Sequence, residues 1–97
     1  MRVHERVEVL YSGHVQGVGF RQRTVETARD FEVVGIVRNL ADGRVQLIAE
    51  GDGNELRRLL AAVDEAMTGF IRNSQVNWYP ATGEYRDFRI RRDGLGG

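Results

Sequence analysis

The segment Gly13-His14-Val15-Gln16-Gly17-Val18-Gly19-Phe20-Arg21 lies between a stretch with the alternation of a β-strand and a stretch with the periodicity of an α-helix. Its glycines allow successive backbone amides to turn toward one point, and the start of a helix leaves several N–H groups without partners. Arg21 adds a planar guanidinium with several donors. The segment therefore predicts a strand, a loop able to surround a tetrahedral anion, and a helix, in that order.

The sequence on either side of this loop supports that order. Residues 6–12 predict a half-buried strand, since Val7, Val9 and Tyr11 alternate with more polar positions. Residues 20–31 predict a helix, because small or apolar side chains recur along one stripe. That stripe consists of Phe20, Thr24, Ala28 and Phe31.

Two more strands are predicted at residues 34–39 and 44–50. Between them, Asp42-Gly43 is a dipeptide that supplies the positive φ angles of a hairpin turn. Alternation in the second of these strands predicts that three side chains face the core. They are Val45, Leu47 and Ala49.

A second helix is predicted from Asp52 to a stop at Gly69. Asp52 and Glu55 have the spacing of a capping box, which typically opens a helix. Apolar side chains follow at helical intervals and predict the buried face of this helix. They are Leu56, Leu59, Leu60, Val63 and Met67.

The remaining sequence predicts strands at residues 75–79 and 85–91 around a turn at 80–83. Phe88 and Ile90 are expected to face inward. Trp78 is interpreted as packing in the core or on a sheet face. The arginine-rich range 86–92 is interpreted as a solvated strand face.

The order of these elements favours an α+β fold. Strand, helix, strand, strand, helix, strand, with a short extra strand at the end, is the ferredoxin-like split β-α-β sandwich (βαββαβ). This arrangement has an antiparallel sheet of four to five strands with two helices on one face. A chain of 97 residues is expected to form a single domain, residues 1–97, around one core.

Composition restricts the possible partners. Fourteen basic residues balance fourteen acidic ones, so no global field favours nucleic acid, and an anion site has to be local. The chain has no cysteine, which fits a reducing compartment, and its apolar runs are too short for a signal peptide or a membrane span. We expect a cytoplasmic monomer that binds a small molecule, with no nucleic acid or membrane partner.

Two polar positions are the candidates for chemistry. Arg21 follows the glycine loop, and Asn39 stands at the end of the second strand, where its amide could orient a water molecule. Taken singly, the loop could be a glycine-rich turn with a surface arginine, and Asn39 could simply lead into a turn. A β-α-β unit, however, can bring the loop and the end of the second strand together. The pair therefore predicts one site.

Several blocks of the sequence resemble the acylphosphatase family. The first is Gly13 to Arg21, and the second is Gly35-Ile36-Val37-Arg38-Asn39 followed by Asp42-Gly43-Arg44-Val45. Ala49-Glu50-Gly51 and Gly83-Glu84-Tyr85-Arg86-Asp87-Phe88-Arg89-Ile90 are also similar to later segments of that family. The resemblance implies hydrolysis of acyl phosphates to a carboxylate and inorganic phosphate.

The resemblance also implies roles for individual residues. Arg21 matches the family's phosphate-binding arginine, Asn39 its water-orienting asparagine, and Thr24 a threonine that supports the site. The phosphate-binding loop corresponds to Gln16, Gly17, Val18, Gly19 and Phe20.

Four positions depart from the usual pattern of the family. Glu32 stands where glycine commonly ends the first helix, so that turn is expected to be strained or shaped differently. Ile36 replaces a common aromatic residue, Phe70 a common proline, and Asp87 a frequent glycine. None of them coincides with Arg21 or Asn39, and they bear on local stability and loop shape.

The predicted site contains no group that titrates near neutral pH, which restricts it to activated substrates. An acyl phosphate qualifies, because its leaving carboxylate has a conjugate acid with a pKa of about 4. No cofactor and no metal are expected, since His4 and His14 are the only histidines and have no partners at ligand spacing. His14 is interpreted as a loop side chain. The alternative function is a non-catalytic anion-binding or regulatory ferredoxin-like module.

Overall fold

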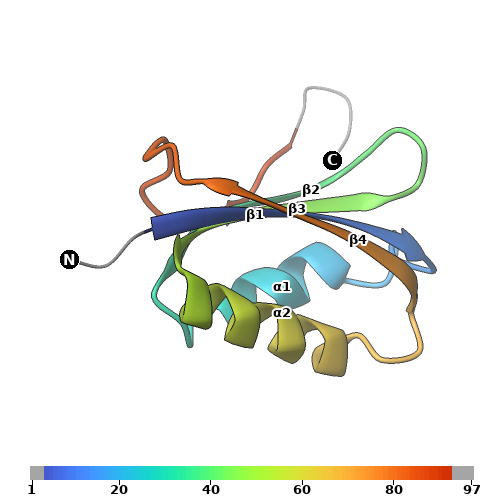
Figure 1. The fold of residues 1–97 in the computed structure, drawn as a ribbon. Helices are drawn as coiled ribbons and strands as arrows, with labels where there is room; N and C mark the ends of the chain where they lie inside the picture. The colour runs from blue at the N-terminus through green and yellow to red at the C-terminus, as the bar shows by residue number, and fades with distance from the viewer. Residues whose placement is uncertain (1–3, 93–97) are drawn as a thin grey trace.

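The computed structural model describes residues 4–92 as one sheet covered by two helices. The sheet has five strands in the order β4-β1-β3-β2-β5, and both helices lie on one of its faces (Figure 1). This confirms the predicted α+β sandwich. The elements are β1 (His4–Gly13), α1 (Phe20–Ala28), β2 (Val33–Asn39), β3 (Val45–Asp52), α2 (Gly53–Ala66), β4 (Ile71–Pro80) and β5 (Phe88–Ile90).

The core lies between the sheet and the helices. Strands β1 and β3 pair antiparallel in the middle of the sheet, with Val9 opposite Leu47 and Tyr11 opposite Val45. These inward side chains are buried as the alternation predicts, and those of α2 close the core from the other side. Each large apolar side chain buried in this way contributes about 1.5–3 kcal/mol. The buried side chains of α2 include Leu56, Leu59 and Val63.

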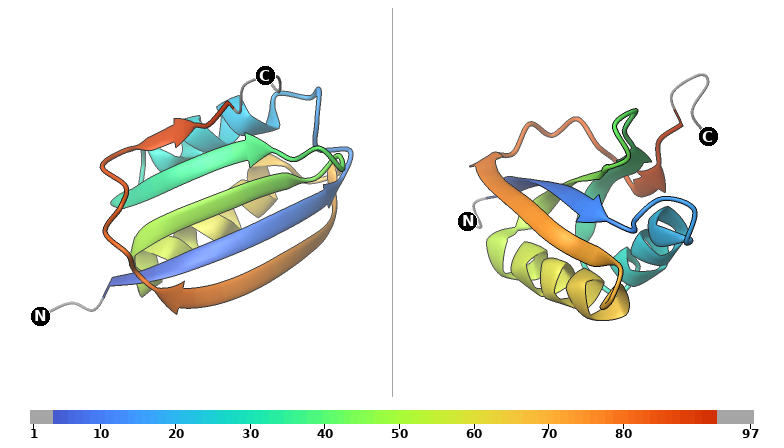
Figure 2. Two further views of the ribbon diagram at one scale, coloured as in Figure 1. Left: turned by 90° about the horizontal axis from the view of Figure 1, so that it is seen from above. Right: turned by 90° about the vertical axis from the view of Figure 1, so that its right-hand side faces the viewer.

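The last strand differs from the prediction in length and direction. β5 has three residues rather than the expected range 85–91, and it pairs parallel with β2. β4 and β5 occupy opposite edges of the sheet, so residues 81–87 must cross it, and they do so over the face opposite the helices (Figures 1 and 2). That crossing returns the chain in the direction of β2. The sheet is consequently mixed, with four antiparallel strands and one parallel edge strand.

Two helix ends also differ from the predictions. α1 ends at Ala28 because the next three N–H groups, those of residues 29–31, each bond to a carbonyl three residues back at 3.1–3.3 Å. The predicted capping box does not form. Asp52 is the N-cap residue of α2 without a side-chain cap hydrogen bond. Glu55 instead accepts a hydrogen bond from the backbone N–H of Glu32 at 3.1 Å.

The hairpin between β2 and β3 is correctly located, but its turn is of another type. Only Gly43 has a positive φ, 96°, whereas Asp42 does not. The N–H of Gly43 bonds to the carbonyl of Leu40 at 3.2 Å, and the N–H of Leu40 bonds to the carbonyl of Arg44 at 2.8 Å. The loop therefore has three residues and needs a single left-handed glycine. The Asp42 side chain accepts from the Arg44 N–H at 3.0 Å.

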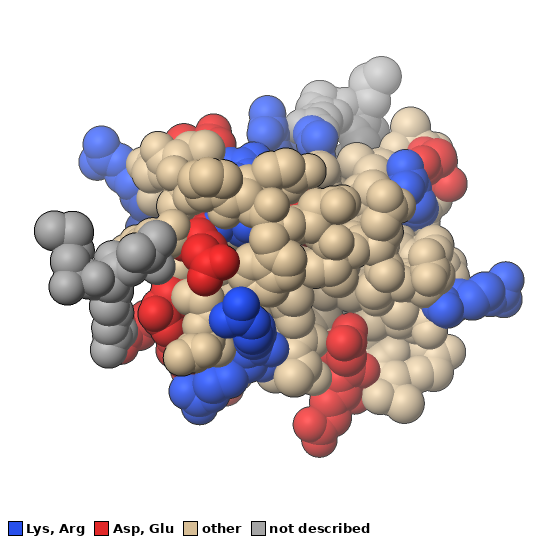
Figure 3. All heavy atoms as spheres, in the orientation of Figure 1, with Lys and Arg blue, Asp and Glu red and all other residues tan. Residues whose placement is uncertain are grey.

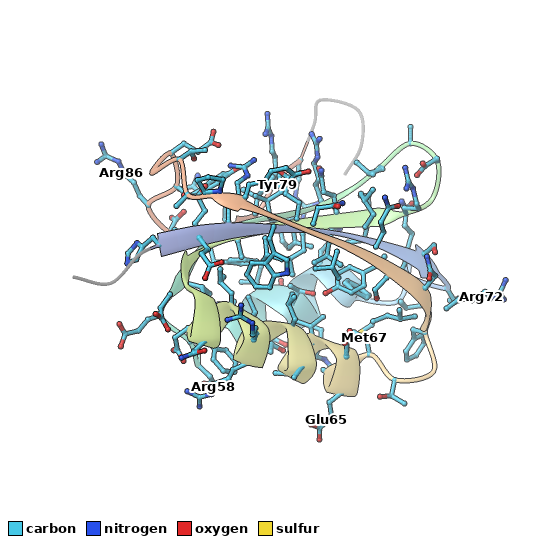
Figure 4. The ribbon with its side chains drawn as sticks, in the orientation of Figure 1. Arg58, Glu65, Met67, Arg72, Tyr79 and Arg86 are labelled. Carbon is cyan, nitrogen blue, oxygen red and sulfur yellow. The ribbon has the colours of Figure 1, made fainter. Side chains whose placement is uncertain are left out.

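β4 is an edge strand and is more exposed than the interpretation of its aromatic residues suggested. Trp78 retains 38% of its surface exposed, and the Arg57 guanidinium of α2 lies 5.0 Å from the centroid of its ring. Tyr79 points away from the helices, on the other side of the sheet (Figure 4). Trp78 therefore packs on a sheet face at the margin of the core.

The four departures from the family pattern are accommodated without left-handed strain. No residue other than glycine has a positive φ in the described chain, so the turn at Glu32 takes another shape. Ile36 is buried opposite Ile48. Phe70 is exposed, but its carbonyl accepts from the His14 N–H at 2.8 Å. The carbonyl of Asp87 accepts from the Gly35 N–H at 2.8 Å.

Within residues 4–92, neither helix has the length and apolar composition needed to cross a bilayer.

Candidate active site

A hollow of roughly 160 Å³ lies where β1 gives way to α1, at the end of the sheet where β2 also ends. Its lining includes both Arg21 and Asn39. The β-α-β arrangement thus brings together the two side chains that are 18 positions apart in the sequence. The lining residues are Val15, Gly17, Gly19, Phe20, Arg21, Gln22, Asn39, Ile90 and Arg92.

The loop before α1 has a backbone suited to an anion. Gly17 and Gly19 both have a φ of 78°, while the φ of Val18 between them is negative. Alternation of this kind can turn neighbouring N–H groups toward one side of the chain. A Cβ added to either glycine would meet no atom within 4 Å. Backbone conformation, and not crowding inside the protein, therefore requires glycine here, and the space in front of the loop is open.

Apolar and polar contacts fix the two ends of this loop. Val15 and Phe20 are almost completely buried, and the Phe20 ring packs against Tyr11 with 5.0 Å between centroids. The amide nitrogen Nε2 of Gln16 donates to the carbonyls of Leu40 and Arg44, at 2.8 and 3.0 Å. The Gln16 side chain thus fastens the loop to the hairpin that follows Asn39, outside the hollow.

No side chain of the first turn neutralises the partial positive charge at the start of α1. Its N-cap residue, Gly19, has no side chain to bond the first amides, and the first turn contains no acidic residue. The N-terminus of a helix carries a partial positive charge, so an external anion is favoured there. Thr24 is completely buried, and its hydroxyl donates to the Phe20 carbonyl at 2.8 Å. Thr24 therefore supports the first turn from below and does not line the hollow.

Arg21 projects from this first turn and is partly buried. Burial, and after it the neighbouring Arg92, lower the pKa of Arg21 from its usual value. Because an arginine pKa starts so high, the guanidinium stays charged at neutral pH. The lowered pKa means that the charge is partly desolvated and lies close to another cation, which raises its affinity for an anion.

Asn39 is the last residue of β2, and its side chain borders the hollow. Its Oδ1 atom is buried and has no hydrogen-bond partner among the described residues. A buried acceptor without a donor costs about 1–3 kcal/mol. A water molecule that donates to Oδ1 would recover this energy.

Some predicted site residues do not reach the hollow, and some of its lining was not predicted. Gln16, Val18 and Thr24 lie outside its described lining, as does His14. The sequence interpretation missed Val15, Gln22, Ile90 and Arg92. Alternation could have indicated Arg92, because Phe88 and Ile90 face inward and Arg92 follows on the same side of the strand. Only the parallel pairing of β5 with β2 places that side next to Asn39.

Charge is distributed without a large single-sign area on the face that Figure 3 shows, where acidic and basic side chains are interspersed. No large area of one sign on this face would therefore attract anions at long range. Between residues 4 and 92, no three His, Cys, Asp or Glu side chains gather as potential metal ligands.

Fold and site together define a small α+β protein in which a glycine loop, an arginine and an asparagine border one hollow. The acylphosphatase family model matches residues 7–90. An acylphosphatase of Salinibacter ruber is 43% identical over 89 residues, which cover 91% of this chain and 94% of that protein. An acylphosphatase of Methanospirillum hungatei is 41% identical over 91 residues, which cover 92% of this chain and 99% of that protein.

A solved structure agrees with these sequence matches. The crystal structure of acylphosphatase from Bacillus subtilis superposes with a TM-score of 0.83 at 29% identity, covering 91% of this chain and 99% of that one. The chain therefore belongs to the acylphosphatase family. The predicted family, fold and enzyme class are thereby confirmed, and membership in a family of enzymes disfavours the non-catalytic module.

Proposed function

We propose that the hollow beside Arg21 is the active site, and that it hydrolyses acyl phosphates to a carboxylate and inorganic phosphate. The phosphoryl oxygens bind to the amides of residues 16–20 and to the Arg21 guanidinium. One observation carries this proposal, namely that Arg21 and Asn39 border the same hollow in front of two left-handed glycines. Phosphoryl transfer requires mainly positioning and stabilisation of charge on the equatorial oxygens, which such an arrangement can supply.

Asn39 is proposed to orient the attacking water. The water donates one hydrogen bond to Oδ1, the acceptor that has no partner among the described residues. Its oxygen forms a bond to phosphorus while the bond from phosphorus to the acyl oxygen breaks. The carboxylate leaves with the electron pair of that bond, and the proton of the water passes to an oxygen of the phosphoryl group. The products are a carboxylate and inorganic phosphate.

The chemistry of the lining supports an acyl phosphate rather than a phosphate monoester. None of the described lining residues is a His, Asp, Glu, Cys, Lys or Tyr, so none of them can act as a general acid near neutral pH. An alkoxide leaving group would need such an acid. A carboxylate leaves unprotonated, because the pKa of its conjugate acid is about 4.

The size of the hollow supports a substrate recognised by its phosphoryl end. Roughly 160 Å³ is well below the ~300–1,000 Å³ of pockets that enclose drug-sized ligands. The phosphoryl group and the adjoining acyl carbon fill such a space, and the rest of the acyl group extends toward solvent. We therefore propose a broad tolerance for the acyl group.

Several further proposals concern the state of the protein. We propose a single-domain monomer that acts in the cytoplasm without a cofactor, nucleic acid or membrane partner. Balanced charge disfavours nucleic acid.

The variant Arg21→Gln tests the proposed function. Removing the guanidinium leaves the equatorial oxygens to the backbone amides, so we expect turnover of benzoyl phosphate to fall by about 100-fold or more. Inhibition by inorganic phosphate weakens in parallel. Steady-state hydrolysis with phosphate as competitor measures both effects. Wild-type kinetics in this variant would remove Arg21 from the site.

A further inference from the structure

Arg92 reaches the hollow because β5 runs parallel to β2. Gly35 pairs with Phe88, Ile36 with Arg89 and Val37 with Ile90. The N–H of Arg91 extends this ladder by donating to the Val37 carbonyl at 3.0 Å. Two further steps in the same register bring Arg92 level with Asn39. Figure 2 shows β5 beside α1, at the edge of the sheet next to β2.

Strand alternation decides which arginine of this segment faces the site. Phe88 and Ile90 are partly buried and pack against the core, and Ile90 also lines the hollow. Arg92 continues this side and lines the hollow two residues later. Arg89 lies on the opposite side, where it pairs with Asp87 at 2.9 Å in an exposed position.

Two guanidinium groups therefore border one small hollow. Like charges that border one small hollow repel each other, and the pKa of Arg21 is lowered by burial and then by Arg92. An anion placed between them removes the repulsion and gains attraction from both. One arginine comes from the first turn of α1 and the other from the segment that follows β5, and both line the hollow.

We propose that Arg92 is a second anion-binding residue, which contacts the phosphoryl oxygens of the substrate together with Arg21. This inference rests on the proposed function, because it assigns Arg92 to the same site. The backbone loop and Arg21 hold one side of the phosphoryl group. Arg92 holds the side next to Asn39, and so limits how far the group can tilt relative to the attacking water.

Binding of inorganic phosphate to Arg92→Gln and Arg89→Gln tests the proposal. Both variants remove one positive charge from the same segment, so Arg89→Gln is the matched control for net charge. By isothermal titration calorimetry, we expect Arg92→Gln to weaken phosphate binding by about 10-fold or more, as loss of a charged hydrogen bond does. Arg89→Gln should stay within about 2-fold, as exposed pairs contribute little. Equal affinities in the two variants would overturn the proposal.

Thermal unfolding separates ligand contact from a structural role. Without phosphate, Arg92→Gln should melt at the wild-type temperature or slightly above it, because it removes a like-charge repulsion. The upward shift caused by phosphate should be clearly smaller in Arg92→Gln, since weaker binding stabilises the folded state less. A lowered melting temperature without phosphate, with an unchanged phosphate shift, would instead make Arg92 structural and reject the proposal.

Ionic strength separates direct contact from long-range attraction. Between about 0.01 M and 0.15 M salt, the screening length falls from about 30 Å to about 8 Å. A contact keeps its fold-effect over this range, and we expect that result. If the loss of phosphate affinity in Arg92→Gln disappeared at the higher salt concentration, direct contact between Arg92 and the phosphate would be contradicted.

The proposed function and the role of Arg92 can be rejected separately, because phosphate binding is measured without turnover. Wild-type turnover in Arg21→Gln would reject the proposed function. Normal phosphate binding by Arg92→Gln, with loss in Arg21→Gln, would reject only the role of Arg92.

Discussion

Gly19 combines two roles at the scale of the single residue. It is the N-cap residue of α1, and its φ of 78° turns the preceding loop toward the hollow. A residue with a Cβ would have to leave this conformation or accept strain of about 1–2 kcal/mol. The atoms around Gly19 do not oppose a Cβ, so the effect of a substitution isolates backbone conformation.

We expect Gly19→Ala to weaken phosphate binding by about 10-fold or more, because the loop amides no longer converge. Its free energy of unfolding should fall by about 1 kcal/mol. Gly69→Ala is a matched control, since Gly69 also has a positive φ, 93°, and open space around it. Urea denaturation should show similar losses of stability in both variants, and calorimetry a loss of binding only in Gly19→Ala. Equal phosphate binding in the two would contradict an anion-binding role for the loop.

Among the elements, β3 carries the residue Glu50, which holds the connection between β4 and β5 in place. Its side chain is 3% exposed and accepts hydrogen bonds from the N–H groups of Thr82 and Gly83 at 3.0 and 2.9 Å. The Thr82 hydroxyl and Arg6 also donate to it, at 2.8 and 3.1 Å. These bonds hold the connection 81–87 on the sheet and thereby fix the path that leads Ile90 and Arg92 to the hollow.

The same contacts predict a pH-dependent contribution to stability. Burial alone would raise the pKa of Glu50, but the hydrogen bonds from Thr82, Gly83 and Arg6 lower it overall below its usual 4.5. The unfolded chain therefore binds this proton more tightly. The stabilisation is complete above the ordinary pKa and is lost as the pH falls through the lower folded value.

We expect Glu50→Gln to lower the free energy of unfolding by about 2 kcal/mol at pH 7, because charged hydrogen bonds are lost. The difference from wild type should narrow below about pH 4. Glu84→Gln is the control, since it removes another partner of Arg6 that is 55% exposed, and it should cost at most about 1 kcal/mol. Urea denaturation across this pH range measures both. If the difference in unfolding free energy between Glu50→Gln and wild type did not depend on pH, a stabilising role for the charged Glu50 carboxylate would be contradicted.

The elements themselves could be predicted from the sequence to different degrees. Alternation located β1 and β3 with their inward faces, because both strands lie at the centre of the sheet with one face on the core. The direction of β5 could not be predicted from its own residues, since a crossing connection and not local pattern sets it. The capping box failed for a related reason, because Glu55 finds a tertiary partner in Glu32.

At the scale of the whole molecule, the sheet places the site at one of its ends and the fastening of the 81–87 connection toward the other (Figure 1). The placement of Arg21 and Asn39 around one hollow could be predicted, because a β-α-β unit brings their positions together and the motifs around both residues are specific. The tether made by Gln16 and the presence of Arg92 could not, since both depend on contacts between segments far apart in the sequence.

In the proposed mechanism, Arg21 binds the phosphoryl group and Asn39 orients the attacking water. Asn39→Ala tests it most directly, with Asn77→Ala on the exposed strand β4 as control. We expect kcat on benzoyl phosphate to fall by about 100-fold or more in Asn39→Ala, as loss of a positioning group does. Phosphate affinity should stay within about 2-fold and the melting temperature near that of wild type, because Oδ1 has no described partner to lose. Loss of phosphate binding together with turnover, or turnover equal to that of Asn77→Ala, would contradict the account.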